Sequence, residues 1–337
     1  MKTTQILFTD IGKAELVEKE IGEIAEDEVL IRNDYTVLSA GTEKANLLNL
    51  PNVGHRFPKL LGYSGCGHVL RAGKRVTDVR EGDMVLTDHL GHSKYVKAAF
   101  HPNGDGYYPV RQKVEAPEAA FVVIGSMGVQ GLRKTRLQMG ESAMVTGLGI
   151  LGMFAVQAAA LSGALPLIAV DPDEDRRKTA KELGADFCLN PLEGDFRERV
   201  RELTCGRMIN ANVEVTGSAA ALRQALSVAA FMGRITLTGC TRVSDCAIDF
   251  YSEVHRPGIQ LIGAHNFVRP TGDSREGYWT RHDDFATILG FLENGKMKVR
   301  PLIHEVLSPK DCTAVYADLC RKEKMPLGIV FDWSRVE

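Results

Sequence analysis

The sequence lacks the features that mark secreted, disulfide-bonded or membrane-spanning proteins. Its seven cysteines are scattered, and no two follow the spacing C-x-x-C, a pattern typical of reduced thiols in the cytosol. The longest apolar stretch, Met153–Leu161, is far too short to cross a bilayer, and the N-terminal segment MKTTQILFTD has no apolar core of a signal peptide. We therefore expect a cytoplasmic protein that does not enter a membrane.

Neither sign of charge is in excess. Lysine and arginine number 41 and aspartate and glutamate 43, and the net charge of -2 gives no electrostatic reason to expect nucleic acid or an anionic membrane as partner. Hydrophobic residues make up 44% and charged residues 25% of the chain, the balance of a globular protein. A length of 337 residues exceeds one ordinary core and favours two domains.

The N-terminal third has short runs of valine, isoleucine, leucine and threonine, separated by glycine, aspartate and asparagine, which are typical of β-strands. Pro117 introduces the first long helix, expected at Ala116–Leu137. A late helix is expected at Asp283–Glu293, and strands near Leu302–Val306 and Gly328–Phe331 can rejoin the N-terminal sheet. The expected N-terminal strands are Thr4–Thr9, Lys13–Glu20, Glu28–Val37, Gly65–Ala72 and Asp83–Thr87.

From Gly140 the pattern changes to strands that alternate with helices, which predicts a parallel sheet with helices on both faces. Six strands with a crossover after the third match the doubly wound dinucleotide-binding fold. We divide the chain into a β-rich part at residues 1–139, a doubly wound part at 140–265 and a C-terminal segment at 266–337. The expected strands are Ala143–Thr146, Leu167–Val170, Phe187–Leu189, Asn212–Val215, Arg234–Thr238 and Ile259–Gly263, and the expected helices are Ile150–Leu161, Asp173–Leu183, Phe196–Leu203 and Ala219–Phe231.

The segment Val145–Gly152 contains the pattern G-x-G-x-x-G between a strand and a helix, as a dinucleotide-binding loop requires. Gly147 allows the tight turn, Gly149 lets the backbone approach a pyrophosphate, and Gly152 lets the helix pack on the sheet. The N-terminus of the helix then presents N–H groups to the phosphates. A glycine-rich turn that binds no ligand is the alternative.

Asp171 ends the second strand of this part, about 20 residues after Gly152, where a carboxylate binds the adenosine ribose hydroxyls. Because a carboxylate repels a 2′-phosphate, Asp171 favours NAD over NADP. Alternatively, Asp171 caps the helix that follows Pro172. Arg176 and Arg177 either serve a phosphate or form a solvated helix face.

Several further segments follow one another in an order and spacing that are specific when taken together. They are Leu61–Val69 (LGYSGCGHV), Glu81–Val85, Ala211–Gly217, Gly233–Gly239 and Gly295–Ile303. With them the chain resembles the medium-chain dehydrogenase/reductase superfamily, the group of zinc alcohol dehydrogenases and quinone reductases. The resemblance implies an α/β fold in which a Rossmann domain that binds NAD(H) is inserted into a GroES-like β-barrel domain, and a homodimer paired through strand Ile259–Gly263. The residues expected to contact the cofactor are Gly147, Gly149, Ile150, Leu151, Gly152, Asp171, Thr216 and Gly239.

The chain departs from the zinc enzymes of this superfamily at their metal ligands. Ala40 takes the position of the first cysteine, Tyr63 that of the histidine and Ser64 that of the adjacent glutamate. The third ligand should fall within Val122–Gly125, where no Cys, His, Asp or Glu occurs. The four-cysteine lobe of the structural zinc is also absent, so zinc is not expected and no residue is assigned to a metal.

Without zinc, hydride transfer needs a positioned acid or base at the reacting oxygen. Tyr63 is the first candidate, because the resemblance places its side chain where a zinc ligand would point at that oxygen. A base of this kind needs a neighbour that lowers the phenol pKa of about 10. Otherwise Tyr63 packs the cleft and donates one hydrogen bond.

His89 is the second candidate, because an imidazole transfers protons near neutrality; the alternative is a histidine on a surface loop. The segment Asp88–His92 also has metal-ligand residue types but no third ligand at a sensible spacing. Thr42 matches the hydroxyl that relays the substrate proton in the zinc enzymes, unless it binds the nicotinamide ribose or caps a turn. Glu43 and Lys44 are interpreted as solvated.

These residues predict an NAD-dependent oxidoreductase that transfers a hydride between the nicotinamide and a polar secondary alcohol or ketone resembling a sugar, polyol or cyclitol. The polar segment His265–Arg269, which follows the last Rossmann strand, favours a hydroxylated substrate. A quinone or enone reductase is one alternative, against which Asp171 argues. A non-catalytic protein that binds NAD(H) without turning over any alcohol is another.

Overall fold

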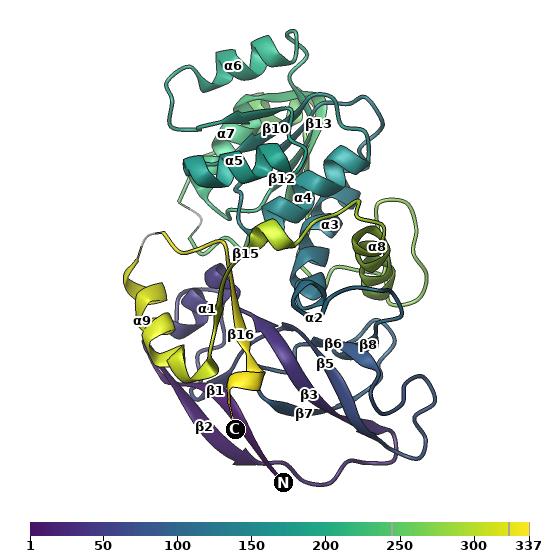
Figure 1. Cartoon of the computed structure of the whole chain (residues 1–337). Coiled ribbons are helices and arrows are strands. Elements are labelled where there is room, and N and C mark those ends of the chain that lie inside the picture. The colour runs from purple at the N-terminus through teal and green to yellow at the C-terminus, as the bar shows by residue number, and fades with distance from the viewer. Residues whose placement is uncertain (244, 323, 337) are drawn as a thin grey trace. The chain divides into compact units, whose positions relative to one another are not determined.

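The computed structural model describes residues 1–243, 245–322 and 324–336, and its internal contacts divide the chain into two units (Figure 1). The first unit combines Met1–Ile124 with Phe285–Glu337, and the second is the continuous segment Gly125–Asp284. The second unit extends beyond the predicted range 140–265 at both ends. Helix α3 and the segment that follows the last strand contact this sheet, which adds them to the unit.

The first unit is built on a mixed sheet in the order β15-β16-β3-β5-β6-β8, with β7 pairing β3, and a smaller sheet in the order β2-β1-β4. Strand β16 pairs antiparallel with β3, with Val330 opposite Val37, so the prediction that the C-terminal strands rejoin the N-terminal sheet is confirmed. Figure 1 shows the yellow C-terminal strand β16 beside the purple strand β3. The strands are β1 (Lys2–Asp10), β2 (Lys13–Glu20), β3 (Glu28–Val37), β4 (Lys59–Leu60), β5 (Ser64–Ala72), β6 (Met84–Asp88), β7 (Tyr95–Ala99), β8 (Gly106–Pro109), β15 (Ile303–Leu307) and β16 (Gly328–Asp332).

The helices of the first unit differ from the sequence prediction. Helix α1 (Ala40–Leu47) was not predicted, although it contains two of the residues considered for the site. The single helix expected at Ala116–Leu137 is two, α2 (Ala116–Ala119) and α3 (Val122–Thr135), because the fully buried pair Ala120 and Phe121 forms a turn between them. No helix in the described ranges has the length and apolar character needed to cross a membrane. The remaining helices of this unit are α9 (Cys312–Arg321), η2 (Arg300–Leu302), η3 (Pro309–Asp311) and η4 (Trp333–Arg335).

The second unit contains a parallel sheet in the order β11-β10-β9-β12-β13-β14, the doubly wound order predicted from the sequence. The helix expected at Ala219–Phe231 ends at Ser227, because Ala229 already pairs with Ile209 at the start of β13. The strands are β9 (Ala143–Thr146), β10 (Leu167–Val170), β11 (Phe187–Leu189), β12 (Ile209–Glu214), β13 (Ala229–Leu237) and β14 (Gln260–Gly263). The helices are α4 (Ile150–Leu161), α5 (Glu174–Glu182), α6 (Phe196–Leu203), α7 (Ala219–Ser227), the π-helix η1 (Phe250–His255) and α8 (Arg281–Glu293), which continues beyond Asp284.

A stripe of glycines brings α3 close to α4. Gly125 and Gly128 face Phe154 and Leu151, and a β-carbon on Gly128 would lie 2.1 Å from the carbonyl oxygen of Leu151. The next glycine of the stripe, Gly131, faces the side chains of Val213 in β12 and of Thr238, which follows β13. Only glycine permits this approach of two helices. Helix α3 therefore supports the helix that begins at the glycine-rich loop.

Candidate functional site

The glycine-rich loop joins β9 to α4 in the second unit and has the geometry predicted for it. Gly147 adopts φ 94°, and a β-carbon on Gly152 would lie 1.9 Å from the carbonyl oxygen of Gly147, so the turn and the helix are packed together. No atom lies within 4 Å of the place that a β-carbon on Gly149 would take. Gly149 precedes the first helical residues, Ile150 and Leu151, without a side-chain cap. The N–H groups at this end of α4 are thus available to a phosphate.

Asp171 lies at the end of β10 and is 6% exposed. Its Oδ2 accepts the N–H of Leu148 in the glycine-rich loop at 2.8 Å, and its Oδ1 accepts the N–H of Asp173 at 2.8 Å. The alternative that Asp171 caps the next helix is wrong, because the N-cap of α5 is Asp173, whose side chain accepts the N–H groups of Asp175 and Arg176. Asp171 instead holds the glycine-rich loop by a hydrogen bond, and its carboxylate lies next to that loop.

The two arginines that follow are tied to the same strand end. The Arg177 guanidinium donates to the carbonyl oxygens of Asp171 and Pro172 at 2.7 and 2.8 Å. Arg176 places its Nη1 3.9 Å from Asp171 Oδ2. The description of these side chains as a solvated helix face is therefore wrong for Arg177, because its guanidinium is hydrogen-bonded to the backbone at Asp171.

Thr216 and Gly239 lie at the carboxyl ends of the two neighbouring strands. A β-carbon on Gly147 would lie 2.6 Å from the Thr216 methyl group, and one on Gly239 would lie 2.2 Å from the nitrogen of Gly217. Glu214, which the sequence analysis did not single out, accepts the N–H groups of Thr216 and Gly217, and burial raises the pKa of its carboxyl group. The predicted cofactor residues thus lie together at the carboxyl ends of the parallel strands, where this fold binds its ligands.

In the first unit, the three residues proposed for catalysis lie together. The Tyr63 hydroxyl is 2.7 Å from Ser39 Oγ, and Thr42 lies near enough to influence the pKa of the phenol. The ring of His89 stacks on that of Tyr63, with centroids 5.4 Å apart and an interplanar angle of 24°. Helix α1, the start of β5 and the end of β6 supply these side chains, which are distant in sequence. Ser39 was not predicted as a site residue, and its place before α1 is the signal that was missed.

Burial raises the pKa of Tyr63, and the carboxylates of Glu43 and Asp88 raise it further. Hydrogen bonds from Ser39 and Thr42 act in the opposite direction but do not reverse the shift. Among the described residues, no neighbour therefore brings the pKa of this phenol below its ordinary value. Tyr63 stays protonated over the neutral range, which suits a hydrogen-bond donor and not a base.

His89 adopts φ 58°, a backbone conformation that non-glycine residues take mainly where their surroundings fix them. Its Nδ1 contacts the buried carboxylate of Asp88 and lies 3.5 Å from Asp105 Oδ1. Among the described residues, Asp88, His89 and Asp105 are the group whose ligand atoms lie close enough to hold a metal, all within 4.8 Å. Both carboxylates approach the same ring nitrogen, so hydrogen bonding accounts for the arrangement. Asp88 orients the ring, as carboxylates orient basic histidines elsewhere.

Glu43 is fully buried, so its interpretation as a solvated residue is wrong. Its carboxylate accepts the N–H of Ser39 at 2.8 Å, and both of its oxygens lie 3.2 Å from Nε2 of His92. The Tyr316 hydroxyl donates to Oε2 from helix α9. Three donors compensate the loss of water around this carboxylate. Because Ser39 also bonds the phenol of Tyr63, Glu43 positions that hydroxyl.

His92 belongs to this buried network and not to a metal site with its neighbours in sequence. Its Nδ1 lies 2.8 Å from Thr36 Oγ1, which also accepts the indole N–H of Trp333 at 3.0 Å. The Glu43 carboxylate can only accept, so the ring N–H at Nε2 points to Glu43, and in the neutral ring Nδ1 accepts the hydrogen of the Thr36 hydroxyl. The network runs from β3 and α1 to the C-terminal segment.

The positions at which the resemblance places zinc ligands hold side chains of other chemistry. Ala40 offers a methyl group, and Tyr63 offers a phenol with a raised pKa. The buried Ser64 hydroxyl donates to the carbonyl oxygen of Ala120 at 2.6 Å and accepts the N–H of Ile124 at 3.1 Å. Zinc in proteins is held by thiolates, imidazoles and carboxylates. These residues do not fit the metal.

Comparison with known proteins gives one consistent result. A family model described as zinc-binding dehydrogenase matches residues 151–271. D-guloside 3-dehydrogenase of Escherichia coli (strain K12) is 27% identical over 278 residues, which are 80% of this chain and 77% of that protein. L-threonine 3-dehydrogenase of Pyrococcus furiosus is 26% identical over 322 residues, 86% of this chain and 87% of that protein.

Solved structures share the fold over nearly the whole chain. The crystal structure of galactitol-1-phosphate dehydrogenase from Escherichia coli has a TM-score of 0.83 at 19% identity and covers 98% of this chain and 99% of that one. That of 2R,3R-butanediol dehydrogenase from Bacillus subtilis has a TM-score of 0.80 at 19% identity with the same coverage. The predicted pairing of a GroES-like domain with a Rossmann domain is confirmed. The chain belongs to the medium-chain dehydrogenase/reductase superfamily and is an alcohol dehydrogenase-like oxidoreductase.

Proposed function

We propose that the protein is an NAD-dependent dehydrogenase of polar secondary alcohols that works without catalytic zinc. The observation that carries this proposal is the cluster of Ser39, Thr42 and Tyr63 hydroxyls beside the ring of His89, with Tyr63 at a position where a zinc ligand would stand. The relatives named for oxidation of a guloside and of threonine are dehydrogenases of hydroxylated substrates, which supports this substrate class.

The cluster has the groups needed to donate a hydrogen bond to the alcohol oxygen and to accept its proton. A bound NAD would accept the hydride from the carbinol carbon. Ser39 can donate to the Tyr63 oxygen, which leaves the phenol hydrogen for the oxygen of the substrate. His89, oriented by Asp88, takes the hydroxyl proton, so that the alcohol leaves as a ketone. Thr42 lies near the same phenol and offers a second hydroxyl to the substrate.

A screen of polyols, sugars and cyclitols for NADH formation tests the function, with zinc measured in the same purified sample. Oxidation of one of these alcohols by metal-free protein is the expected result. Stoichiometric zinc with activity lost on chelation would overturn the metal-free mechanism. Reduction of quinones or enones alone, or tight NAD(H) binding with no turnover, would favour the two alternative functions.

The Asp171 carboxylate should set the preference for NAD(H) over NADP(H), because a fixed negative charge beside the glycine-rich loop repels a 2′-phosphate. Asp171→Asn removes the charge and keeps an oxygen that can accept the Leu148 N–H. We expect the dissociation constant of NADP(H) divided by that of NAD(H), both measured by fluorescence titration, to fall by about tenfold or more in this variant. Asp186→Asn, just before strand β11, where the carboxylate accepts the N–H of Leu167, serves as control. Equal affinities in the unmodified protein would remove the argument.

The edge strand β14 should pair two copies of the chain. It ends the parallel sheet on one side, and an edge of this kind is normally covered. Next to it Phe231, Met232, Phe250 and Tyr251 are each more than half exposed. We expect light scattering to give about twice 36.9 kDa, and Tyr251→Asp to shift the mass toward the monomer. Met139→Asp, at a still more exposed residue elsewhere on the second unit, should not shift the mass. A monomeric parent would contradict the pairing.

A further inference from the structure

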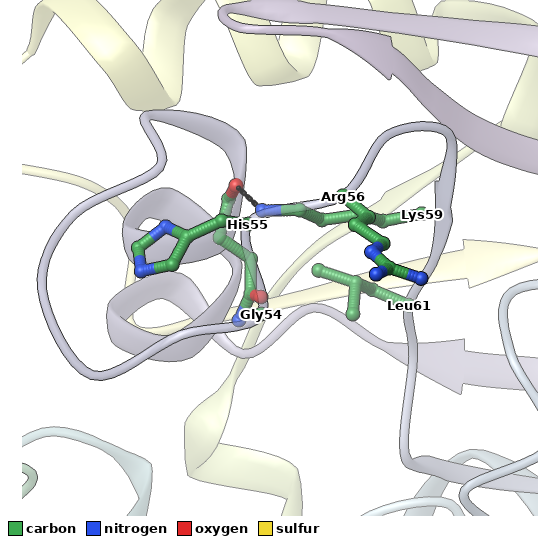
Figure 2. Close-up of a pocket in the computed structure, with 6 residues that line it drawn as sticks. Gly54, His55, Arg56, Lys59 and Leu61 are labelled. Carbon is green, nitrogen blue, oxygen red and sulfur yellow. Dashed lines mark hydrogen bonds between the residues drawn. The ribbon is translucent and has the colours of Figure 1, made fainter.

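A basic pocket lies in the first unit where the loop after α1 leads into β4. It has a volume of about 470 Å³, within the range of small-molecule sites. Figure 2 shows its labelled side chains gathered around this loop. Three of the lining side chains are basic and none is acidic. The residues that line it are Asn46, Gly54, His55, Arg56, Lys59 and Leu61.

Lys59 is the strongest sign that this pocket is made for an anion. It is 92% buried, since only 8% of its surface is exposed, and burial lowers its pKa. Its ammonium group donates to the carbonyl oxygen of Asn46 at 2.8 Å and to Asn49 Oδ1 at 3.2 Å, and both acceptors are neutral. In the described part of the chain no carboxylate pairs with it. Buried charges are ordinarily paired, so the pocket holds a cation whose counter-charge the protein does not supply.

Arg56 adds a second cation at the mouth of the same pocket. Its guanidinium is exposed, and it forms no ion pair with any residue that the structure describes. The planar fork of arginine binds two oxygens of a phosphate or carboxylate at once, whereas lysine acts as a point charge. His55, whose Nδ1 lies 3.1 Å from Asn49 Oδ1, completes the basic lining. A dianionic group with several oxygens matches this set better than a single carboxylate.

The pocket is a neighbour of the proposed catalytic cluster. Asn46 lines it and donates from Nδ2 to the carbonyl oxygen of Thr42 at 3.0 Å, one helical turn earlier in α1. One turn advances a helix by about 5.4 Å. Leu61, on the other wall, stands two residues before Tyr63. The pocket and the catalytic cluster are therefore built on the same two segments, helix α1 and the link from β4 to β5.

We propose that this pocket binds the phosphate of a phosphorylated polyol or sugar, so that the substrate of the proposed dehydrogenase is an anionic alcohol. The inference rests on the proposed function for the identity of the reaction, whereas the anion site itself does not. Phosphate bears a charge of about −1.5 to −2 at neutral pH and three strong acceptor oxygens, which Arg56 and Lys59 can share.

Calorimetric titration with inorganic phosphate tests the site without reference to activity. We expect saturable binding that weakens about tenfold in Arg56→Gln, and further when Lys59→Met is added, because each variant removes a charge-assisted hydrogen bond to the phosphate. Arg80→Gln, an exposed arginine of the same unit, is the matched control and should bind as the parent does. Acetate should bind more weakly. Equal affinity of the parent and Arg56→Gln for phosphate would overturn the proposal, as would acetate binding as tightly as phosphate.

Kinetics with matched substrates then test the link to the reaction. A hexitol phosphate should show a KM at least about tenfold lower than the same hexitol, and Arg56→Gln should abolish this difference while kcat changes little. Equal KM values for the two substrates would refute the substrate class. If neither is oxidised while phosphate still binds at Arg56, the proposed function fails and the anion site stands.

Discussion

Replacing Tyr63 by Phe should lower the rate of alcohol oxidation by about 10²–10³-fold with little change in NAD binding. The phenol is protonated because burial raises its pKa above the ordinary value of 10, and it is aimed by Ser39. Loss of one pre-oriented donor at a developing oxyanion has an effect of this size. Stopped-flow measurement of NADH formation, with NAD affinity determined on the same samples, separates the two effects.

The pH profile distinguishes Tyr63 from His89. Since Tyr63 does not titrate below pH 10, the Tyr63→Phe variant should keep the shape of the parental profile over that range. His89→Gln should change the shape of the profile, because glutamine cannot accept the substrate proton. Tyr107→Phe, a buried tyrosine of the same unit outside the cluster, is the control. Losses under about threefold in both variants would remove these residues from the mechanism.

Replacing Glu43 by Ala should lower the free energy of unfolding of the first unit by about 3–5 kcal/mol. The change leaves the Ser39 N–H, the His92 ring N–H and the Tyr316 hydroxyl without their shared acceptor in a fully buried place. Removing one partner of a buried charged network costs this much, because the other polar groups cannot recover water. Urea unfolding followed by the fluorescence of Trp333, which is part of the network, measures the loss.

The measurement can be restricted to the first unit. The protein has two tryptophans, and Trp279 stacks on Arg133 in the second unit, so a Trp279→Phe background leaves Trp333 as the reporter. Glu43→Gln keeps one carbonyl oxygen and should lose about half as much. Glu18→Ala, an exposed glutamate on β2, should change stability by less than about 0.5 kcal/mol. A Glu43→Ala variant as stable as this control would show that the network contributes nothing.

The nucleotide-binding half could be predicted from sequence because its signals are local. A strand, a glycine pattern, a helix and an acidic strand end follow one another between Ala143 and Asp171, and each depends on near neighbours in the chain. Periodicity also gave the order of the sheet, since parallel strands joined by helices have few arrangements. The end of α7 was placed too late, because alanine fits a helix as well as the strand that begins at Ala229.

The catalytic half could be predicted only in outline, because its decisive contacts join distant segments. Glu43 follows Thr42 in a polar run that looks solvated, and only folding brings His92 and Tyr316 to it. The same applies to Asp105, which reaches the ring of His89 from the loop before β8. A carboxylate that will be buried has no local mark in the sequence. Such a residue can be recognised only from its hydrogen-bond partners, and these are known only once the tertiary structure is known.

The division of the first unit between the two ends of the chain affects how the protein is made. A ribosome releases residues 1–124 long before β16, the strand that fills the position next to β3, and before Tyr316 and Trp333 of the Glu43 network. The continuous segment Gly125–Asp284 can fold as it emerges, because its whole sheet is then available. During translation the nascent chain therefore carries a finished glycine-rich loop in its second unit and an open sheet edge in its first, and the Glu43 network beneath Ser39 is completed only when the C-terminal segment arrives.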